Sequence, residues 1–391
     1  MRPRHLNLRG KPTSKPLSLY DKWLIAVVIG LVIIGLMMVA SSSVMISTKY
    51  FHQPFHFLIR QVCYLFAGFI VALFVIRTDS SVWERISMPL LIICLFMLLI
   101  VLVPGIGRSV NGSRRWLALG PIGIQVSELA KLTMIFYLAG YLVRQREAVS
   151  ESILGFIKPM MILGVVSLLL LREPDFGATV VISGTVMAML FLAGVKLRYY
   201  IGLLLMVIIA LAFLAVSSPY RMARLTAFLD PWADQYNSGY QLTQSLIAFG
   251  RGGWFGSGLG ESIQKLLYLP EAHTDFLFAV LAEELGLAGI LTVITLYSII
   301  VFRGMMIAYT AYTQDRLFAA YTAYGLTFWL GLQAVINMGV NSGILPTKGL
   351  TLPLMSYGGA SIVINCVVVA LLLRIDHENR WQALGLKPLS A

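Results

Sequence analysis

Long apolar runs recur along almost the whole chain, and they constrain its fold more than any other feature. A helix needs about 20 mostly apolar residues to cross the hydrocarbon core of a bilayer. The first run, Trp23 to Ala40, follows a basic arm, and no small-x-small cleavage site closes it. We therefore predict a retained first helix rather than a signal peptide. Because only 12% of the residues are charged, against about 25% in soluble domains, the sequence predicts an all-α, polytopic integral membrane protein.

The number of apolar runs of this length predicts about ten transmembrane helices. They divide the chain into a basic cytoplasmic N-terminal arm (1–23), a ten-helix membrane domain (24–373) and a cytoplasmic C-terminal tail (374–391). The predicted spans are residues 24–46, 55–76, 84–104, 128–143, 156–171, 178–194, 199–217, 274–301, 318–340 and 354–373.

The basic residues indicate how these spans are oriented. An even number of spans puts both termini on one side, and assigning that side to the cytoplasm places 18 of the 30 Lys and Arg residues on inside loops. Short inside loops are enriched in such residues. We therefore predict cytoplasmic termini and a large outside loop, residues 218–273, between the seventh and eighth spans. Topology and anionic lipid account for the net charge of +12, so no nucleic-acid partner is expected.

Ionisable residues inside the predicted spans are functional candidates, because a charge within a bilayer is costly. Glu128 and Lys131 are three residues apart in the fourth span and are able to pair on one helix face. Such a pair is either a structural ion pair or part of a site. Glu283 and Glu284 of the eighth span differ by about 100° around the helix, so they do not both face one partner. In the predicted topology all four lie in the outer half of the membrane, where one pocket could gather them.

The stretch YLPEAHTDF (268–276) precedes the eighth span and carries two acids and a histidine. Thr274 or Asp275 is a suitable N-cap for that helix, since its side chain can accept from first-turn amides. An acid at this place also lies at the positive end of the helix dipole, which keeps it ionised. An ionised carboxylate facing an outer pocket can instead act as a general base or hold a divalent cation. Both interpretations are compatible with the residues.

Basic residues on the outside loops suggest an anionic ligand on that face, although long loops follow the charge bias only weakly. The glycine-rich run GRGGWFGSGLG (250–260) has no preceding strand and no GKS or GKT, so it is neither a P-loop nor a Rossmann turn. It is either a lid or a set of amides that approach phosphate. Prolines and glycines across 337–361 predict irregular backbone at membrane depth, which is tolerated only against protein or a cavity.

Three long motifs resemble the signature stretches of the SEDS family, the polytopic membrane proteins of shape, elongation, division and sporulation. They are NGSRRWLALGPIGIQVSELAKL (111–132), PEAHTDFLFAVLAEELG (270–286) and ILPTKGLTLPLMSYGGAS (344–361). The motifs occur in the family's order, and with the ten-span layout the likeness covers nearly the whole chain. The TKGLT form and the basic arm are more similar to the cell-division branch than to the rod-elongation branch.

The resemblance implies a peptidoglycan glycosyltransferase that polymerises lipid II at the outer face of the cytoplasmic membrane, at the division septum. It implies a class B penicillin-binding protein as partner, together with other divisome proteins, undecaprenyl-linked glycan and membrane lipid. The family's essential aspartate matches Asp275, and its Glu/Lys pair matches Glu128 and Lys131. Asp275 is the expected ligand of any divalent cation, Mg or Mn. The candidate contacts of the lipid II pyrophosphate are Lys131, Glu128, Arg114, Arg115, Arg172, Arg221, Lys348 and Glu283.

Two other functions are compatible with the same residues. A lipid II flippase requires charged residues along a path through the bilayer, whereas the intramembrane charges here gather in the predicted outer half. A non-catalytic divisome scaffold requires no single indispensable acid. The sequence therefore favours an inverting polymerase, with Asp275 as its base.

Overall fold

The computed structural model describes residues 20–110, 113–119, 122–217, 222, 226–347 and 349–385. Its elements are α1 (Lys22–Phe51), α2 (His56–Arg77), α3 (Ser80–Leu102), β1 (Gly107–Val110), β2 (Ser113–Leu119), β3 (Ile122–Gln125), α4 (Val126–Arg144), α5 (Arg146–Glu151), α6 (Ile153–Arg172), α7 (Phe176–Leu192), α8 (Leu197–Val216), α10 (Tyr240–Gly252), α11 (Leu277–Thr313), α12 (Leu317–Asn341) and α13 (Gly359–Ala383).

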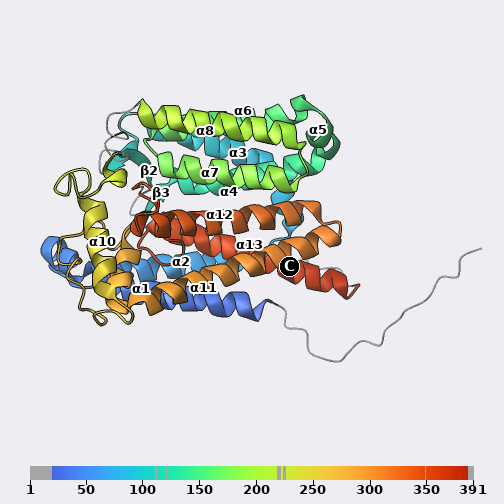
Figure 1. The fold of residues 1–391 in the computed structure, drawn as a ribbon. Coiled ribbons are helices and arrows are strands. Elements are labelled where there is room, and N and C mark those ends of the chain that lie inside the picture. Colours follow the sequence, from blue (N-terminus) through green and yellow to red (C-terminus); the bar gives the residue numbers. More distant parts are fainter. Residues whose placement is uncertain are drawn as a thin grey trace, which may run out of the picture.

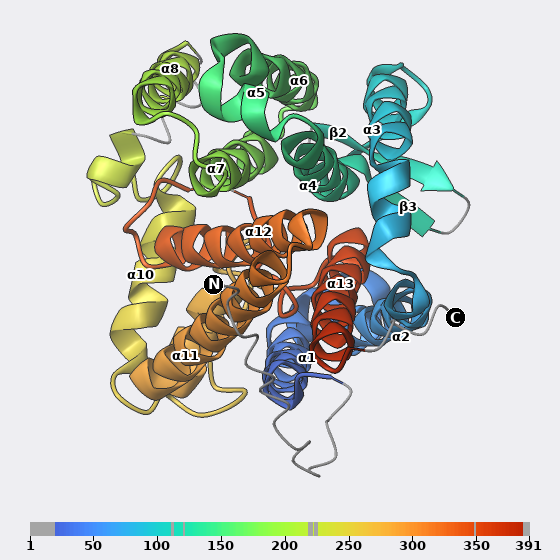
Figure 2. The same ribbon diagram turned by 90° about the vertical axis from the view of Figure 1, so that its right-hand side faces the viewer.

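The long helices lie side by side in one bundle (Figure 1). One end of the bundle, here called the sheet end, carries the three strands, α10 and the first residues of α11 and α13. Viewed along the bundle, α3 to α8 form one group, and α1, α2, α10, α11 and α13 lie on the other side of α12 (Figure 2). Helices α4 and α12 contact each other, and α12 also packs against α7 and α11. Buried residues occupy almost the whole length of α4, as expected for a central helix.

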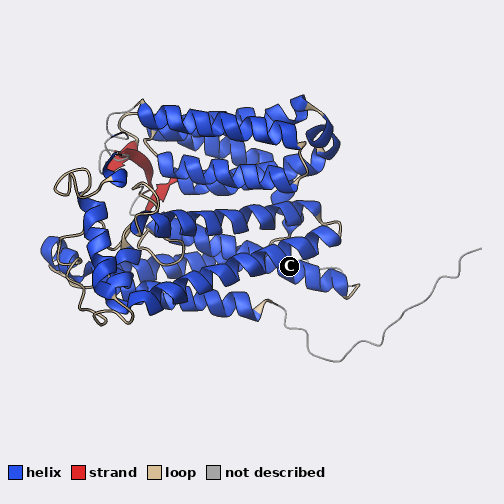
Figure 3. Ribbon diagram, in the orientation of Figure 1, coloured by secondary structure: helices blue, strands red, loops and turns tan. Residues whose placement is uncertain are grey.

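Seven helices in the described part of the chain are long and apolar enough to cross a membrane, by length and composition: α1, α2, α3, α4, α6, α11 and α13. Two shorter apolar helices, α7 and the first part of α8, and the more polar α12 coincide with the remaining predicted spans. The all-α prediction is confirmed for the bundle (Figure 3). It missed one small antiparallel sheet, in the order β1-β2-β3, within the predicted loop 105–127.

Helix α11 differs from the uninterrupted span predicted at 274–301, because it is broken at Gly286 (φ 63°, ψ −160°). The glycine-rich run lies against this break. Leu287 N donates to Gly253 O (2.9 Å), and Ala288 N donates to Trp254 O (3.1 Å). In return, the amides of residues 257 and 258 donate to the carbonyls of Glu283 and Glu284. The run therefore satisfies backbone groups that the broken helix exposes, which is how a helix break is tolerated at membrane depth.

We expect Gly286→Ala to undock the glycine-rich run. A Cβ at this position would lie 2.4 Å from Gly256 N and 2.8 Å from Gly252 O, both backbone atoms. Overpacking costs about 1–3 kcal/mol, and the positive φ adds about 1–3 kcal/mol for a non-glycine residue. The thermal unfolding temperature in detergent should fall well below that of Gly250→Ala, since Gly250 has open space around its Cα. Equal unfolding temperatures for the two variants would show that the close approach is unimportant.

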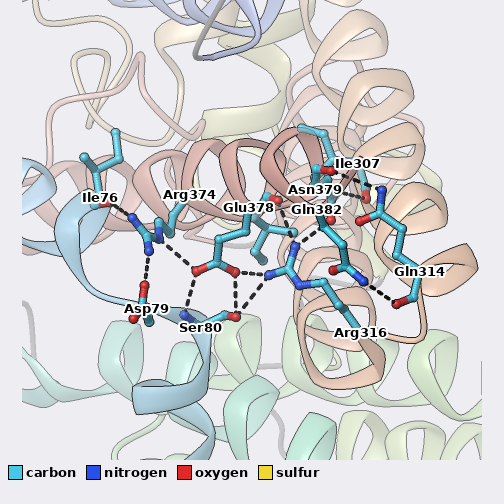
Figure 4. Close-up of polar contacts among 11 residues, drawn as sticks. Ile76, Asp79, Ser80, Ile307, Gln314, Arg316, Arg374, Glu378, Asn379 and Gln382 are labelled. Carbon is cyan, nitrogen blue, oxygen red and sulfur yellow. Dashed lines mark hydrogen bonds and ion pairs between the residues drawn. The ribbon is translucent and has the colours of Figure 1, made fainter. Parts of the chain in front are cut away.

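Helix α13 also differs from its prediction. The predicted span ends at 373, whereas the helix continues to Ala383 and includes the first residues of the predicted cytoplasmic tail, of which 374–379 are buried. Figure 4 shows why these charges are tolerated. The Glu378 carboxylate accepts from Ser80 N (2.9 Å), Arg374 Nε (2.8 Å) and Arg316 Nη2. Arg374 also pairs with Asp79. The polar end of α13 is therefore held by the α2–α3 connection and by the start of α12.

Candidate active site

Asp275 lies at the sheet end in a tight turn just before α11. The amides of Thr274 and Phe276 both donate to Glu271 O (3.1 and 3.2 Å), and Thr274 Oγ1 donates to the Glu271 carboxylate (2.8 Å). Glu271 itself has a left-handed φ of 56°. Tyr357 N, just before α13, donates to His273 O (3.0 Å). The turn is therefore closed internally and tied to the segment that leads into α13.

Neither Thr274 nor Asp275 caps α11, so that prediction is wrong. The N-cap residue is Phe276, without a side-chain cap, and the helix begins at Leu277. A side chain from another helix serves a first-turn amide instead, since Ala279 N donates to Asn341 Oδ1 at the end of α12 (3.1 Å). The first turn of α11 is therefore held in part from α12.

The partly buried Asp275 carboxylate packs against the irregular segment between α12 and α13. A Cβ on Gly349 would lie 2.8 Å from Asp275 Oδ2, so a larger residue here would displace the carboxylate. A Cβ on Gly177, in the first turn of α7, would lie 2.9 Å from the Leu350 side chain. The irregular backbone predicted for 337–361 is confirmed over residues 342–347 and 349–358. It brings α7, α12 and the Asp275 turn together.

Glu128 and Lys131 form a buried ion pair in α4 (2.7 Å between Oε1 and Nζ). Lys131 Nζ also donates to Gln333 Oε1 (2.8 Å) and lies 4.8 Å from the centre of the Trp329 ring. The structure thus places the Lys131 ammonium inside the bundle, surrounded by partners from α4 and α12. These contacts favour the structural interpretation of the pair over direct contact with a ligand.

Glu283 and Glu284 face different partners, as their angular separation predicted. Glu283, predicted to contact substrate, is fully buried and accepts from Arg251 Nη1 (2.8 Å), Ser262 Oγ and two backbone amides. Glu284 pairs with Lys265 (2.8 Å) and accepts from Ser41 Oγ on α1 (2.6 Å). Both glutamates therefore anchor the large loop onto α11, and the Glu283 carboxylate is engaged by the protein itself.

The predicted basic candidates of the outside loops have different surroundings in the described structure. Arg115 Nε and Nη2 donate to the carbonyls of Glu173 (3.2 Å) and Pro174 (2.6 Å), so this guanidinium holds the α6–α7 turn. Arg172, at the end of α6, is exposed. Arg114 lies in β2, in register with Ser109. Arg221 and Lys348 lie outside the described residues.

Glu173, in the α6–α7 turn, is fully buried, and neither carboxylate oxygen has a hydrogen-bond partner in the described structure. Burial and the nearby Asp175 raise its pKa to about 8, although Arg115 opposes the shift. An acid with a raised pKa is protonated in the folded state and ionised in the unfolded state over this range. The folded state therefore binds more protons between about pH 4.5 and 8, and stability falls as pH rises.

We expect Glu173→Gln to remove this part of the pH dependence. The thermal unfolding temperature of the wild type should fall between pH 5 and 8, and the variant, which stays neutral, should be the more stable protein at pH 8. The difference in free energy should be on the order of a few kcal/mol, at about 1.4 kcal/mol per pKa unit. The exposed Glu261 offers a matched control through Glu261→Gln. Parallel pH profiles for wild type and Glu173→Gln would contradict the assignment.

His273 lies in the same turn as Asp275, two residues before it. The His273 ring is buried against Phe57 (4.4 Å between ring centres) and Tyr357 (5.6 Å). Burial lowers its pKa, so the ring is neutral near pH 7. No group of three or more His, Cys, Asp or Glu side chains suited to a metal gathers among the described residues.

Sequence reasoning missed three amide residues of α12. Gln333, Asn337 and Asn341 are all buried and are spaced four residues apart. Asn337 Nδ2 donates to Leu350 O (2.5 Å), and Gln333 Nε2 donates to Thr351 O (2.9 Å). Both asparagines donate to Asp275 O (2.9 Å each). Their i, i+4 spacing inside an apolar span was the signal that could have identified them, because it puts all three on one helix face.

A bundle of membrane-length helices with one partly buried carboxylate fixed at its sheet end defines a polytopic membrane protein with a candidate catalytic acid. The chain belongs to the FtsW, RodA and SpoVE family, described as cell cycle proteins, whose model matches residues 21–381. It is accordingly a multi-pass membrane protein, and the resemblance seen in the motifs is confirmed.

Individual relatives support the assignment over the full length. A Legionella pneumophila protein named probable peptidoglycan glycosyltransferase FtsW is 83% identical over 391 residues, covering 100% of this chain and 99% of the relative. A Coxiella burnetii protein with the same name is 53% identical over 92% of this chain and 97% of its own length. Two solved structures share the fold. One is from a peptidoglycan synthase complex (29% identity, TM-score 0.76, covering 93% of this chain and 99% of that chain), and the other is RodA of Thermus thermophilus (28%, 0.69, 92% and 97%).

Proposed function

We propose that the chain is a peptidoglycan glycosyltransferase that polymerises lipid II into glycan strands, with Asp275 as the general base. The observation that carries this proposal is the placement of Asp275. Its backbone carbonyl accepts from two α12 amides, which fixes this acid in the turn before α11 at the sheet end. The names of the FtsW relatives support the reaction class.

The reaction follows from a carboxylate beside a sugar hydroxyl. Asp275 takes the proton of the 4-hydroxyl of the acceptor sugar, and that oxygen forms a bond to the anomeric carbon of the donor. The bond from that carbon to the pyrophosphate oxygen breaks, and undecaprenyl pyrophosphate leaves with the electron pair. One displacement inverts the anomeric centre. A second carboxylic acid, as in glycosidases, is not required, because pyrophosphate is already a good leaving group.

Positive groups at the sheet end would stabilise the departing pyrophosphate. The exposed Arg172 at the end of α6 is one candidate, and Arg114, Arg221 and Lys348 remain candidates from the sequence. A bound Mg²⁺ or Mn²⁺ would supply further charge neutralisation, with Asp275 as its protein ligand. Arg115, Lys131, Glu128 and Glu283 are engaged within the protein, and we assign them to holding the site together.

We further propose that the sheet end faces the outside of the cytoplasmic membrane and that both termini are cytoplasmic. The distribution of basic residues supports this orientation. The partner would be a class B penicillin-binding protein at the division septum. In support, the chain shares its fold with a member of a peptidoglycan synthase complex.

Purified protein in liposomes, with the transpeptidase partner and fluorescent lipid II, tests the function directly. Glycan polymer on a gel is the expected product. Movement of lipid II between leaflets without polymer would identify a flippase instead. Neither polymer nor movement, with an intact complex, would favour a scaffold.

A further inference from the structure

Three buried amide side chains on one face of α12 lie between the Asp275 turn and the buried ion pair of α4, and Asn337 and Gln333 donate to the successive carbonyls of Leu350 and Thr351. Asn341 and Asn337 are linked directly, since Asn341 Nδ2 donates to the backbone carbonyl Asn337 O (2.8 Å). Gln333 continues the row by one further turn and accepts from Lys131 Nζ. Both asparagines are at most 2% exposed. We propose that Asn337 and Asn341 are positioning residues, which fix the Asp275 carboxylate for catalysis without touching substrate.

The backbone carbonyl of Asp275 is held by both asparagines. A carbonyl oxygen has two lone pairs, and both asparagine amides donate to Asp275 O at 2.9 Å. Two donors on one carbonyl fix the peptide plane that follows the Asp275 Cα. Asn341 also accepts from Ala279 N, so one side chain holds both the residue before α11 and the first turn of that helix. The origin of the Asp275 side chain is therefore fixed from α12.

Asn337 also holds the segment against which the Asp275 carboxylate packs. Asn337 donates to Leu350 O (2.5 Å), and this residue follows Gly349, where a Cβ would lie 2.8 Å from Asp275 Oδ2. The same asparagine therefore sets both the turn that carries the carboxylate and the segment that limits its movement. Substituting Asn337 should shift these two segments relative to each other. A displacement of about 1 Å is enough to reduce a catalytic rate about 100-fold.

The donors that hold the Asp275 turn are neutral amides rather than charged groups. Charged donors so close to Asp275 would compete with substrate for its carboxylate, whereas neutral amides reach the backbone without adding charge. The one buried cation of the row, Lys131, has its charge balanced by Glu128 (2.7 Å) and acts on the site through Gln333. The ion pair thus orients Gln333, whose amide holds Thr351 O two residues beyond Gly349.

This inference rests on the proposed role of Asp275, and its test uses steady-state polymerisation of lipid II by the reconstituted complex. We expect Asn337→Ala and Asn341→Ala each to lower kcat about 10- to 100-fold while KM for lipid II changes less than threefold. Thr322→Val is the matched control. Thr322 is a buried polar residue of α12 outside the row, and its hydroxyl has no partner in the described structure. This control should keep the kcat of the wild type.

Each outcome separates the positioning role from the proposed function. Asn337→Ala leaves the contact to Ala279 intact, so it tests positioning even if Asn341→Ala unfolds, and thermal unfolding identifies folded variants. An unchanged kcat in folded Asn337→Ala, or a rise in KM alone, would overturn the positioning role. If Asp275→Asn polymerises normally, the proposed base is wrong whatever the asparagine variants do. A dead Asp275→Asn beside fully active asparagine variants would remove only the positioning role.

Discussion

Asp275→Asn is expected to abolish glycan polymerisation by a folded complex. The amide is nearly isosteric with the carboxylate and retains the backbone carbonyl that Asn337 and Asn341 hold. It cannot accept the proton of an attacking hydroxyl, and loss of a general base costs about 100- to 10,000-fold in rate. Fluorescent lipid II and a gel of the products give the measurement, with KM for lipid II recorded where residual activity permits.

Glu271→Gln is the matched control for this substitution, because it removes a carboxylate from the same turn. A glutamine oxygen can still accept from Thr274 Oγ1, which donates to Glu271 Oε2 at 2.8 Å. We therefore expect Glu271→Gln to lose at most a few-fold in activity. Wild-type polymerisation by Asp275→Asn would remove Asp275 from the role of base. Equal losses in both variants would indicate that the turn needs negative charge rather than this carboxylate.

The positions of the helices were predictable because a helix that crosses a bilayer needs a long apolar run, and such runs are visible directly in the sequence. Each predicted span overlaps a helix, and both the ion pair of Glu128 with Lys131 and the divergence of Glu283 from Glu284 follow from helical spacing. These features depend on residues close together in the chain. Their geometry is set by the helix itself, so local spacing is sufficient.

The partners that come from distant segments were not predictable in this way. Asn341 serves the first turn of α11 from 62 residues away, and local reasoning assigned that task to Thr274 or Asp275. Similarly, the glycine-rich run completes the broken helix at Gly286, where local composition suggested a lid or a phosphate site. Choosing between such interpretations requires knowing which backbone groups the rest of the fold leaves without partners.

The predicted end of the last span, at residue 373, fell short of the end of α13 for a related physical reason. Hydropathy treats Arg374 and Glu378 as residues that belong in water, and so it ends the helix before them. In the structure each charge is paired, and both residues are at most 4% exposed. Burial of a charge is tolerated when it is paired and hydrogen-bonded. The sequence shows the i, i+4 pair within α13, but not Arg316 or Asp79, which complete the network from elsewhere in the chain.

The second large effect is expected in this network, from Glu378→Ala. Its carboxylate is shared by Arg316 and Arg374 and also accepts from Ser80 N and Oγ. Burial and the nearby Arg374 already lower the pKa of Arg316 to about 10, so the two guanidinium groups disfavour each other's charge. Removing the shared acid leaves them facing each other. Breaking a buried ion pair by deleting one partner costs about 3–5 kcal/mol.

Asp376→Asn separates this expectation from a general sensitivity of α13 to lost charge. Asp376 lies two residues from Glu378, and its partner Arg380 is 27% exposed, so water compensates for much of what the substitution removes. Pairs with an exposed partner contribute about 0–1 kcal/mol. Thermal unfolding in detergent should therefore show a large decrease for Glu378→Ala and a small one for Asp376→Asn. Similar decreases would mean that the shared carboxylate is not the element that holds α2, α12 and α13 together at this end of the bundle.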